Sequence, residues 1–586
     1  MVSLPRVHRA LAVAVAALCH ATSSHAAELP GAPPAENVAC ASEADVEEAC
    51  WLSLRASRAR HATATRKQTG ARRAENKVFL WMSDIHADPL YGKPPPGGVG
   101  GQQCKKPVNE TQAHAFGIVG CDPPYELMSS AAKVAAKSSS TYQFVTFTGD
   151  WTRHAQNNFR YPWGNVTSTI QNVTKIIISE VNASVLGYSG GGQAFGTLGN
   201  DDSPQNYYLN VTTDEAENPW LANVGDVLHT QGAMSSGVVP NYSYGGFFEE
   251  EMGGIVVLMI NTIVYSVSHE GAINQNPEDP FHQFAWLRSR LQSAVDRNVT
   301  VWIMGHIPPG IETYGYSELW RPAYVEKYLA IVQDPTLGPA VAAQLFGHVH
   351  KEEFRLLPNA PRGAGPVLLT SALSPIYQTN PQFRAFEYDP ATGRPVSYNE
   401  TYAELREGTQ EPLWSFGYDL VDAYPVLRQG VRESGFLLMD HFAQLAERLG
   451  AGLEEWDTYA GWYATQRAND LQGCGVATRP QGGAAGLNET QKLACRKKYI
   501  CALTVRTQAQ FNDCEGASAW EQEGQRLSSR LLPHSPHLYY PTLHHQWLAE
   551  QRDEKESVRE LRGALADGRI SDVESCTGRL QRSQPS

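Results

Sequence analysis

Short apolar runs alternate with helix-period segments between residues 77 and 395. In "YELMSSAAKVAAK" (125–137) and "HQFAWLRSRLQSAVD" (282–296), apolar residues recur at helical spacing, which predicts two amphipathic helices. Short apolar runs bounded by polar segments predict strands at 78–83, 143–148, 254–260, 299–304, 342–346 and 366–370. Strands that alternate with helices favour an α/β core over residues 76–395.

The regions outside this core have other patterns. Residues 396–550 are rich in helix formers, Trp and Tyr and show few strand patterns, so we expect a smaller, mainly helical C-terminal subdomain with cysteines. Residues 27–75 are rich in Ala, Arg and Pro without an apolar period, which indicates an extended lead-in. Residues 551–586 are charged and helix-prone, so we expect a charged, solvated tail. A chain of 586 residues is too long for one compact core, in agreement with this division.

The first 26 residues have the pattern of a secretory signal peptide. Arg6 and Arg9 precede the apolar run 10–19, and small residues follow, with cleavage expected near Ala26 or Ala27. An uncleaved anchor is the alternative, but the run has about half the length needed to cross a bilayer. No later apolar stretch is long enough either, so no transmembrane segment is expected.

Glycosylation sequons and cysteines indicate an oxidising compartment. The sequons begin at Asn109, Asn165, Asn172, Asn182, Asn210, Asn241, Asn298, Asn399 and Asn488. Behind a signal peptide they predict a glycoprotein that is secreted or delivered to the lumen of a lysosome or vacuole. Removal of the signal leaves an odd number of cysteines, of which most should pair. The nearest partners along the chain are Cys104 with Cys121 and Cys501 with Cys514.

The charge balance argues against nucleic-acid binding. Lys and Arg number 48 and Asp and Glu number 61, which gives a net charge of −13. The chain has no block of basic residues long enough to follow a phosphate backbone.

Polar residues that suit metal binding follow the predicted strands. They are Asp84 and His86 after 78–83, Asp150 after 143–148, Asn200 after "AFGTL", His306 after 299–304, and His348 and His350 after 342–346. The carboxyl ends of strands in an open α/β sheet meet at one crevice, so these residues are expected to converge. Carboxylate, amide and imidazole groups without thiolates suit two divalent cations, with Asp150 as the bridge. Gly149, which precedes Asp150, would let the turn bring the Asp150 side chain close to the cations.

The ordered motifs "DIH", "GDWTRH", "GND", "GH" and "GHVH" resemble those of the calcineurin-like metallophosphoesterase superfamily. The longer stretches "VWIMGHIPPG", "LFGHVHKEEF" and "LTSALSPIYQTNPQFRAFEYD" are similar to the acid sphingomyelinase-like phosphodiesterases and the related endopolyphosphatases. The resemblance covers about residues 77–400, and "CRKKYICALTVRTQAQFNDC" extends it weakly into the C-terminal part.

The resemblance implies a four-layer αββα sandwich and a site with two metal ions, usually zinc in this family. Asp84, His86, Asp150 and His350 would hold one ion, and Asp150 would bridge to a second held by Asn200, His306 and His348. These ions would activate a water molecule for attack on phosphorus. His154 resembles the family histidine beside the leaving group and would donate the proton.

Asp201 departs from the pattern of the sphingomyelinase-like enzymes, which usually have histidine after this asparagine. Three interpretations are open. The carboxylate could bind a substrate hydroxyl or order water while His154 acts alone as the acid, it could mark a different substrate class such as that of endopolyphosphatases, or it could reduce activity. For Asp202, support of the metal site and a role in a surface turn are equally compatible with "DDSP".

The predicted function is that of a metal-dependent phosphodiesterase. True acid sphingomyelinases carry a saposin-like module with about six cysteines before the catalytic core, whereas only Cys40 and Cys50 stand there in this chain. Soluble phosphodiesters, nucleotide phosphoanhydrides or polyphosphate are therefore favoured over sphingomyelin. The alternatives are an endopolyphosphatase and a catalytically silent metal-binding module.

Overall fold

The computed structural model describes the part of the chain from residue 76 to residue 516. The described residues are 76–93, 101–105, 114–139, 141–155, 162–181, 185, 194–203, 205–212, 219–252, 254–406, 408, 410–452, 454–467, 469, 471, 474 and 489–516. The predicted signal peptide, lead-in and charged tail lie outside them. The described residues all belong to one compact unit, residues 74–533.

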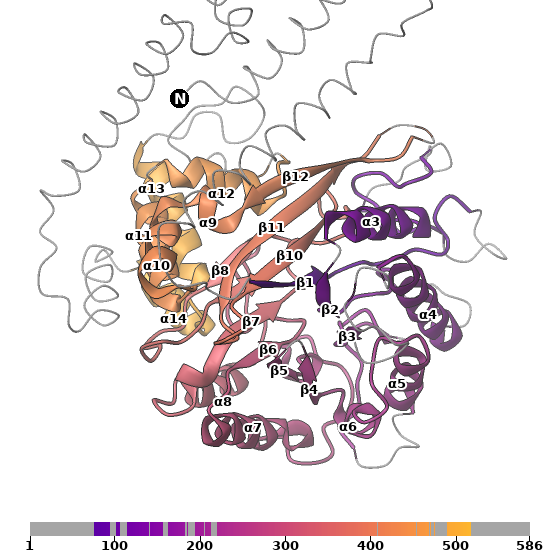
Figure 1. Ribbon diagram of the computed structural model, residues 1–586, viewed down its shortest axis with the longest axis horizontal. Coiled ribbons are helices and arrows are strands. Elements are labelled where there is room, and N and C mark those ends of the chain that lie inside the picture. The colour runs from indigo at the N-terminus through magenta and orange to yellow at the C-terminus, as the bar shows by residue number, and fades with distance from the viewer. Residues whose placement is uncertain are drawn as a thin grey trace, which may run out of the picture. The chain divides into compact units, whose positions relative to one another are not determined.

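The first sheet has six strands. Their spatial order is β12 (Leu413–Asp419), β11 (Pro395–Glu404), β10 (Gln382–Tyr388), β1 (Lys77–Met82), β2 (Tyr142–Phe147) and β3 (Ala194–Gly196). β1, β2 and β3 are parallel, whereas β10, β11 and β12 continue the sheet in antiparallel fashion. The long antiparallel strands extend beyond the rest of the sheet (Figure 1).

The second sheet also has six strands. Their order is β4 (Phe248–Met252), β5 (Ile255–Met259), β6 (Val301–Met304), β7 (Val341–Phe346), β9 (Val367–Leu369) and β8 (Glu353–Arg355). The four inner strands are parallel. The predicted strands 78–83, 143–148, 254–260, 299–304, 342–346 and 366–370 are all confirmed, with small shifts at their ends.

The two sheets pack face to face through buried aromatic side chains. The ring of Phe79 on β1 lies 5.3 Å from that of Trp302 on β6, and Trp302 lies 5.3 Å from Phe386 on β10. All three side chains are buried. Edge-to-face contacts of this kind add to the free energy gained by burying the rings.

Helices cover the outer faces of both sheets (Figure 1). The helices between the strands are α3 (Tyr125–Ser138), α4 (Pro162–Val181), α5 (Trp220–Thr230), α6 (Val239–Gly245), α7 (Gln283–Arg297) and α8 (Pro322–Val332). Short 3-10 helices lie at Ile263–Tyr265, Pro280–His282 and Gly338–Ala340. Trp414 of β12 donates to Ser130 of α3, and Tyr328 of α8 donates to Gln344 of β7. The predicted αββα arrangement is therefore confirmed, together with the helices predicted at 125–137 and 282–296.

Helices dominate the C-terminal part from Leu420. They are α9 (Leu420–Ala423), α10 (Pro425–Ser434), α11 (Met439–Ala451), α12 (Glu455–Tyr463), α13 (Glu489–Leu503) and α14 (Gln508–Gly516). The sequence pattern predicts that the α/β core gives way to a helical subdomain at residue 396. This position lies inside the first sheet, because β11 includes it and β12 follows it. Many side chains of these two strands are partly exposed, so neither strand has a continuous apolar run that the pattern would reveal. None of the helices in the described residues is long and apolar enough to cross a membrane.

Both cysteine pairs expected from the spacing are disulfides. Cys104 bonds to Cys121 and Cys501 to Cys514. A further disulfide joins Cys474 to Cys495, for which the sequence alone indicated no partner. These bonds agree with an oxidising compartment. Cys40, Cys50 and Cys576 lie outside the described residues.

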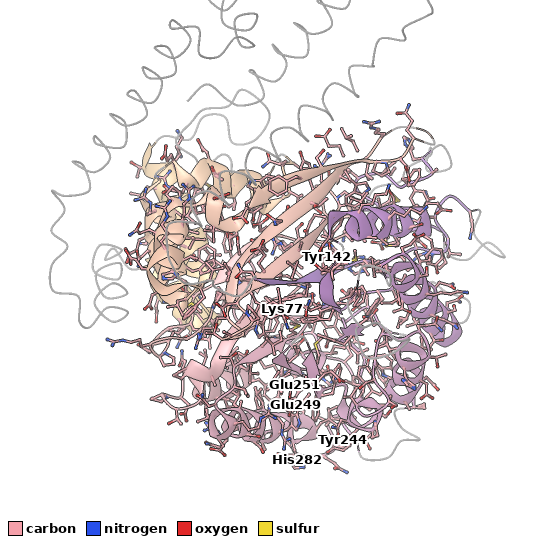
Figure 2. All side chains as sticks on the ribbon, in the orientation of Figure 1. Lys77, Tyr142, Tyr244, Glu249, Glu251 and His282 are labelled. Atoms are coloured by element: carbon pink, nitrogen blue, oxygen red, sulfur yellow. A yellow bond between two sulfur atoms is a disulfide. The ribbon has the colours of Figure 1, made fainter. Side chains whose placement is uncertain are left out.

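A buried arginine connects the two sheets. Arg384 of β10 is fully buried and donates to the carbonyl of Leu369 on β9. Its guanidinium lies 3.2 Å from the carboxylates of both Glu352 and Glu400. By contrast, α7 and β4 are joined on the surface, where Glu249 and Glu251 lie near α7 (Figure 2) and Arg290 is 3.5 Å from Glu249.

We predict that Arg384→Met lowers the free energy of unfolding by about 3–5 kcal/mol, because it leaves two buried carboxylates without their cation. Arg290→Met is the matched control and should cost less than about 1 kcal/mol, since its ion pair is partly exposed and screened by water. Denaturant unfolding of the two variants measures both values. Equal losses would show that Arg384 contributes no more than a surface ion pair.

Candidate metal centre

The loops that follow the parallel strands of both sheets converge on one buried site. From the first sheet, β1 leads to Asp84 and His86, β2 to Asp150, and β3 to Asn200. From the second sheet, β6 leads to His306, and β7 to His348 and His350. The structure brings all seven predicted residues together, as the strand-end argument required.

Five of the seven residues have left-handed backbone conformations. The φ angles of Asp84, His86, Asp150, His348 and His350 are 50°, 47°, 56°, 70° and 57°. Residues with a side chain rarely adopt this region, and each instance costs about 1–3 kcal/mol. Such strain concentrates at functional sites, because the surrounding fold must stabilise it.

A glycine allows the close approach of two of these loops. Gly149 has a φ of 89°, and a Cβ atom there would lie 2.6 Å from the backbone nitrogen of Gly199. A side chain at residue 149 would therefore push the turn that carries Asp150 away from the turn that carries Asn200. The role expected for this glycine is in agreement with the structure.

The first group of side chains consists of Asp84, His86, Asp150 and His350. His86 Nε2 lies 3.4 Å from Asp150 Oδ2 and 4.0 Å from Asp84 Oδ1. His350 Nε2 lies 3.3 Å from Asp84 Oδ1 and 3.0 Å from His86 Nε2. Ligand atoms of Asp84, His86 and Asp150 are close enough together to hold a metal ion.

The second group consists of Asp150, Asn200, His306 and His348. His306 Nε2 lies 3.1 Å from Asp150 Oδ2, 3.1 Å from Asn200 Oδ1 and 3.3 Å from His348 Nδ1. Asp150, His306 and His348 can also hold a metal ion. Oδ2 of Asp150 faces both groups, as a bridging carboxylate must.

Backbone carbonyls set the orientation of two of the imidazoles. His86 donates from Nδ1 to the carbonyl of Thr152 over 3.0 Å, and His306 donates from Nδ1 to the carbonyl of Thr148 over 2.7 Å. The Nε2 atoms therefore point into the site, which is the arrangement of metal-binding histidines. Sequence reasoning missed these partners because a carbonyl group carries no residue-type signal.

The donor set fits divalent cations. Nε2 of His306 faces oxygen atoms of Asp150 and Asn200, and these three atoms can lie so close only if a proton or a cation stands between them. Two buried carboxylates likewise require compensating positive charge. Nitrogen and oxygen ligands without thiolate are typical of zinc and other divalent transition metals.

The pKa values of the imidazoles separate into two kinds. Burial lowers the pKa of His86 and His350, and burial together with His306 lowers that of His348 to about 3, so these rings are neutral as metal binding requires. Burial also lowers the pKa of His306, but the carboxylates of Asp150 and Asp84 and the Thr148 carbonyl together outweigh it and raise the pKa to about 9. For Asp84, burial raises the pKa, but His350 and its other neighbours lower it to about 2.

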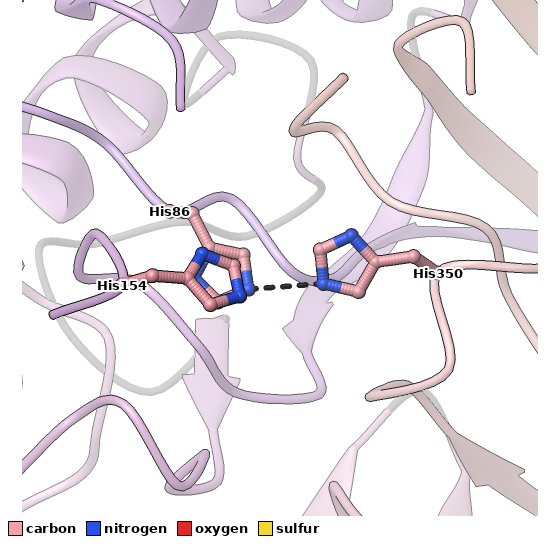
Figure 3. Close-up of side chains that lie close together, drawn as sticks. All are labelled: His86, His154 and His350. Atoms are coloured by element: carbon pink, nitrogen blue, oxygen red, sulfur yellow. Dashed lines mark hydrogen bonds between the residues drawn. The ribbon is translucent and has the colours of Figure 1, made fainter. Parts of the chain in front are cut away.

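His154 lies directly against the first group. Its ring stacks on that of His86, with centroids 3.9 Å apart and planes 16° apart. The ring of His350 lies beside this stacked pair, with its centroid 4.9 Å from that of His86 and 5.9 Å from that of His154 (Figure 3). Nδ1 of His154 is 3.0 Å from Asp122 Oδ2, and Nε2 is 3.8 Å from Asp201 Oδ2. Burial lowers the pKa of His154, but the carboxylates of Asp122 and Asp201 raise it to about 9. Asp122 was not predicted from the sequence, because nothing in "CDPPYE" marked it.

No protein-family model matches the chain. Several curated proteins are similar to the chain. The acid sphingomyelinase-like phosphodiesterase 3b of Homo sapiens is 29% identical over 378 residues, which are 61% of this chain and 78% of the relative. A cyclic GMP-AMP phosphodiesterase of Homo sapiens is 26% identical, over 59% of this chain and 75% of the relative.

The chain is a homologue of the acid sphingomyelinase-like phosphodiesterases. The resemblance predicted from the motifs is therefore confirmed. Among solved structures, a dimetal phosphatase from Danio rerio is similar, with a TM-score of 0.33, 12% identity, and coverage of 58% of this chain and 98% of that one.

In this phosphodiesterase homologue, Asp202 supports the turn that carries Asp150. Its carboxylate is fully buried and accepts four backbone N–H groups. The donors are Asp150 and Gly199, each over 2.8 Å to Oδ2, and Trp151 and Thr152, over 2.8 and 3.1 Å to Oδ1. Of the two interpretations of Asp202, support of the site is confirmed and a surface turn is wrong.

Aromatic and basic side chains lie next to the imidazoles at the edge of the site. The ring of Tyr377 packs edge-on against His350 and His154, with centroids 4.7 and 5.3 Å apart. Nζ of Lys105 lies 4.1 Å above Tyr377, and Lys351 donates to the carbonyl of Tyr377 over 2.9 Å. Part of the Tyr377 side chain is exposed, so this residue separates the buried imidazoles from water.

We predict that Asp202→Ala destabilises the protein by at least about 2 kcal/mol, because buried N–H groups lose their acceptor. The matched control is Asp226→Ala on the exposed side of α5, which removes a carboxylate far from any such cluster and should have little effect. Thermal and denaturant unfolding compare the two. A loss no larger than that of the control would mean that water replaces the Asp202 carboxylate without cost.

Proposed function

We propose that this chain is a secreted or lumenal dimetal phosphodiesterase that cleaves soluble phosphodiester or phosphoanhydride bonds. The observation that carries the proposal is the position of Asp150 Oδ2, which lies 3.4 Å from His86 Nε2 and 3.1 Å from His306 Nε2. One carboxylate oxygen that faces ligand groups of two sheets is the arrangement a two-metal hydrolase needs. The homology to named phosphodiesterases supports the same activity.

In the proposed site, Asp84, His86, Asp150 and His350 would hold one cation, and Asp150, Asn200, His306 and His348 would hold the other. Both cations are divalent, and zinc suits the ligand types. When bound, such cations would neutralise phosphoryl oxygens and would lower the pKa of a water molecule, which would supply the nucleophile for phosphorus.

His154 is the proposed proton donor to the leaving oxygen. Asp122 holds Nδ1, so Nε2 is the nitrogen available to the substrate. The ring is 14% exposed and is the outermost of the stacked pair with His86. A positioned general acid of this kind contributes about 10²–10⁴-fold to the rate.

The basic residues next to Tyr377 favour an anionic, water-soluble substrate. Lys105 and Lys351 both contact Tyr377, next to the imidazoles of the site. Their ammonium groups would attract phosphates additional to the one that reacts, as in nucleoside triphosphates or polyphosphate. The disulfides in the described residues support a protein that matures in an oxidising compartment.

We predict that His154→Ala slows turnover of a bis-aryl phosphodiester by at least about 100-fold and retains both metal ions, since a general acid is lost and no ligand is. Asp150→Asn is the comparison and should lose both turnover and bound metal. Metal analysis of the purified variants, combined with kcat, separates these outcomes.

The three imidazoles of His86, His154 and His350 could also hold a metal ion together. If His154→Ala lost a cation, His154 would be a ligand and not the acid. If the wild-type protein bound two cations and turned over no phosphodiester at all, the silent metal-binding module would replace the enzyme.

We predict that ATP and polyphosphate are cleaved faster than sphingomyelin in detergent. We also expect Lys105→Ala to raise KM for ATP several-fold and to leave KM for a choline phosphodiester unchanged, because only the polyanion has a phosphate for this lysine. Initial rates on the four substrates test both statements. If sphingomyelin were cleaved faster than ATP and polyphosphate, the assignment of a soluble polyanionic substrate would be contradicted. The same KM for ATP in the wild type and in Lys105→Ala would contradict it as well.

A further inference from the structure

The amide of Asn200 is held in one orientation by acceptors on its nitrogen side. Its side-chain nitrogen donates to Asp201 Oδ2 and to Asn206 Oδ1, each over 2.9 Å. Both amide hydrogens are therefore used. The amide oxygen points the opposite way, 3.1 Å from His306 Nε2, into the second group of proposed ligands.

Asp201 decides this orientation, because a carboxylate can only accept hydrogen bonds. An amide that presented its oxygen to Asp201 would bring two acceptors together inside the protein, where no water separates them. The Asn206 side chain cannot decide alone, since its own amide can rotate and offer either an oxygen or a nitrogen. Asp201 is 1% exposed, so solvent does not weaken the effect.

The backbone of Asp201 contributes to the same group. Its N–H donates to Asp150 Oδ1 over 2.8 Å, which leaves Asp150 Oδ2 facing the imidazoles of His86 and His306. One residue thus contacts the bridging carboxylate through its backbone and the neighbouring amide through its side chain.

We propose that Asp201 is a positioning residue that turns the Asn200 amide oxygen toward the second cation. The inference rests on the proposed dimetal site and goes beyond it, because it assigns the aspartate at the departure from the family pattern to metal binding and not to the substrate. Partners that orient ligands in this way typically change metal affinity by about 10–100-fold.

The pair can be tested by exchanging its two members. Asp201→Asn keeps the shape but removes the obligatory acceptor, so it should weaken the second cation by about 10–100-fold and leave the first unchanged. Asn200→Asp places two carboxylates against each other. The swapped variant Asn200→Asp/Asp201→Asn restores one donor and one acceptor at the same total charge.

The experiment titrates the metal-free full-length protein with Zn²⁺ alone and reads the two dissociation constants by calorimetry, with Co²⁺ absorption as a second readout of the ligand geometry. The changes in binding free energy of the two single variants, added together, give an expected affinity of the swapped variant for the second cation. We expect the swapped variant to bind this cation at least about tenfold more tightly than that. Additive effects, or an Asp201→Asn variant with both affinities of the wild type, would overturn the inference.

The experiment includes two controls. Asp226→Asn on α5 removes one carboxylate outside the site and should leave both affinities unchanged. Unchanged binding at the first site shows that each variant is folded. The readout requires no turnover, so a wild-type protein that binds two cations without hydrolysis would contradict the proposed phosphodiesterase activity and still test the role of Asp201.

Discussion

A single carboxylate oxygen joins the two halves of the sandwich at the candidate site. Oδ2 of Asp150, at the end of β2 in the first sheet, faces His86 from the same sheet and His306 from the second. It can do so only because the aromatic core around Phe79 and Trp302 holds the sheets face to face with their parallel strands ending at one edge. The site is therefore a property of the packing of two sheets and not of any one loop.

The cost of bringing these groups together is spread over their surroundings. Left-handed backbone at five of the seven residues would be unfavourable in an isolated loop, yet each turn is tied down by hydrogen bonds, most clearly where Asp202 accepts four N–H groups around Asp150. Carbonyls of Thr148 and Thr152 fix two imidazoles in the same way. A site prepared like this requires little rearrangement to bind charge, which is the condition for strong electrostatic stabilisation.

Two carboxylates flank the proposed proton donor. Asp122 and Asp201 both approach His154, and Asp201 also accepts from Asn200, so the proposed proton donor and a proposed metal ligand share one neighbour. The departure from the family pattern at residue 201 thus belongs to a connected group of polar contacts. This connection explains why a carboxylate can stand there without isolating a buried charge.

The sequence by itself indicated the α/β class, the strands β1, β2, β5, β6, β7 and β9, the partners of two disulfides as nearest cysteines, and all seven residues that converge, because apolar runs followed by Asp, Asn or His are local patterns. It did not reveal β11 and β12, whose exposed side chains interrupt the apolar pattern, nor the role of Asp122. Only the tertiary structure decided which atoms face one another. The carbonyls that orient His86, the acceptor that orients Asn200 and the burial of Asp202 all depend on contacts between segments far apart in the chain, and no local pattern of residue types encodes such contacts.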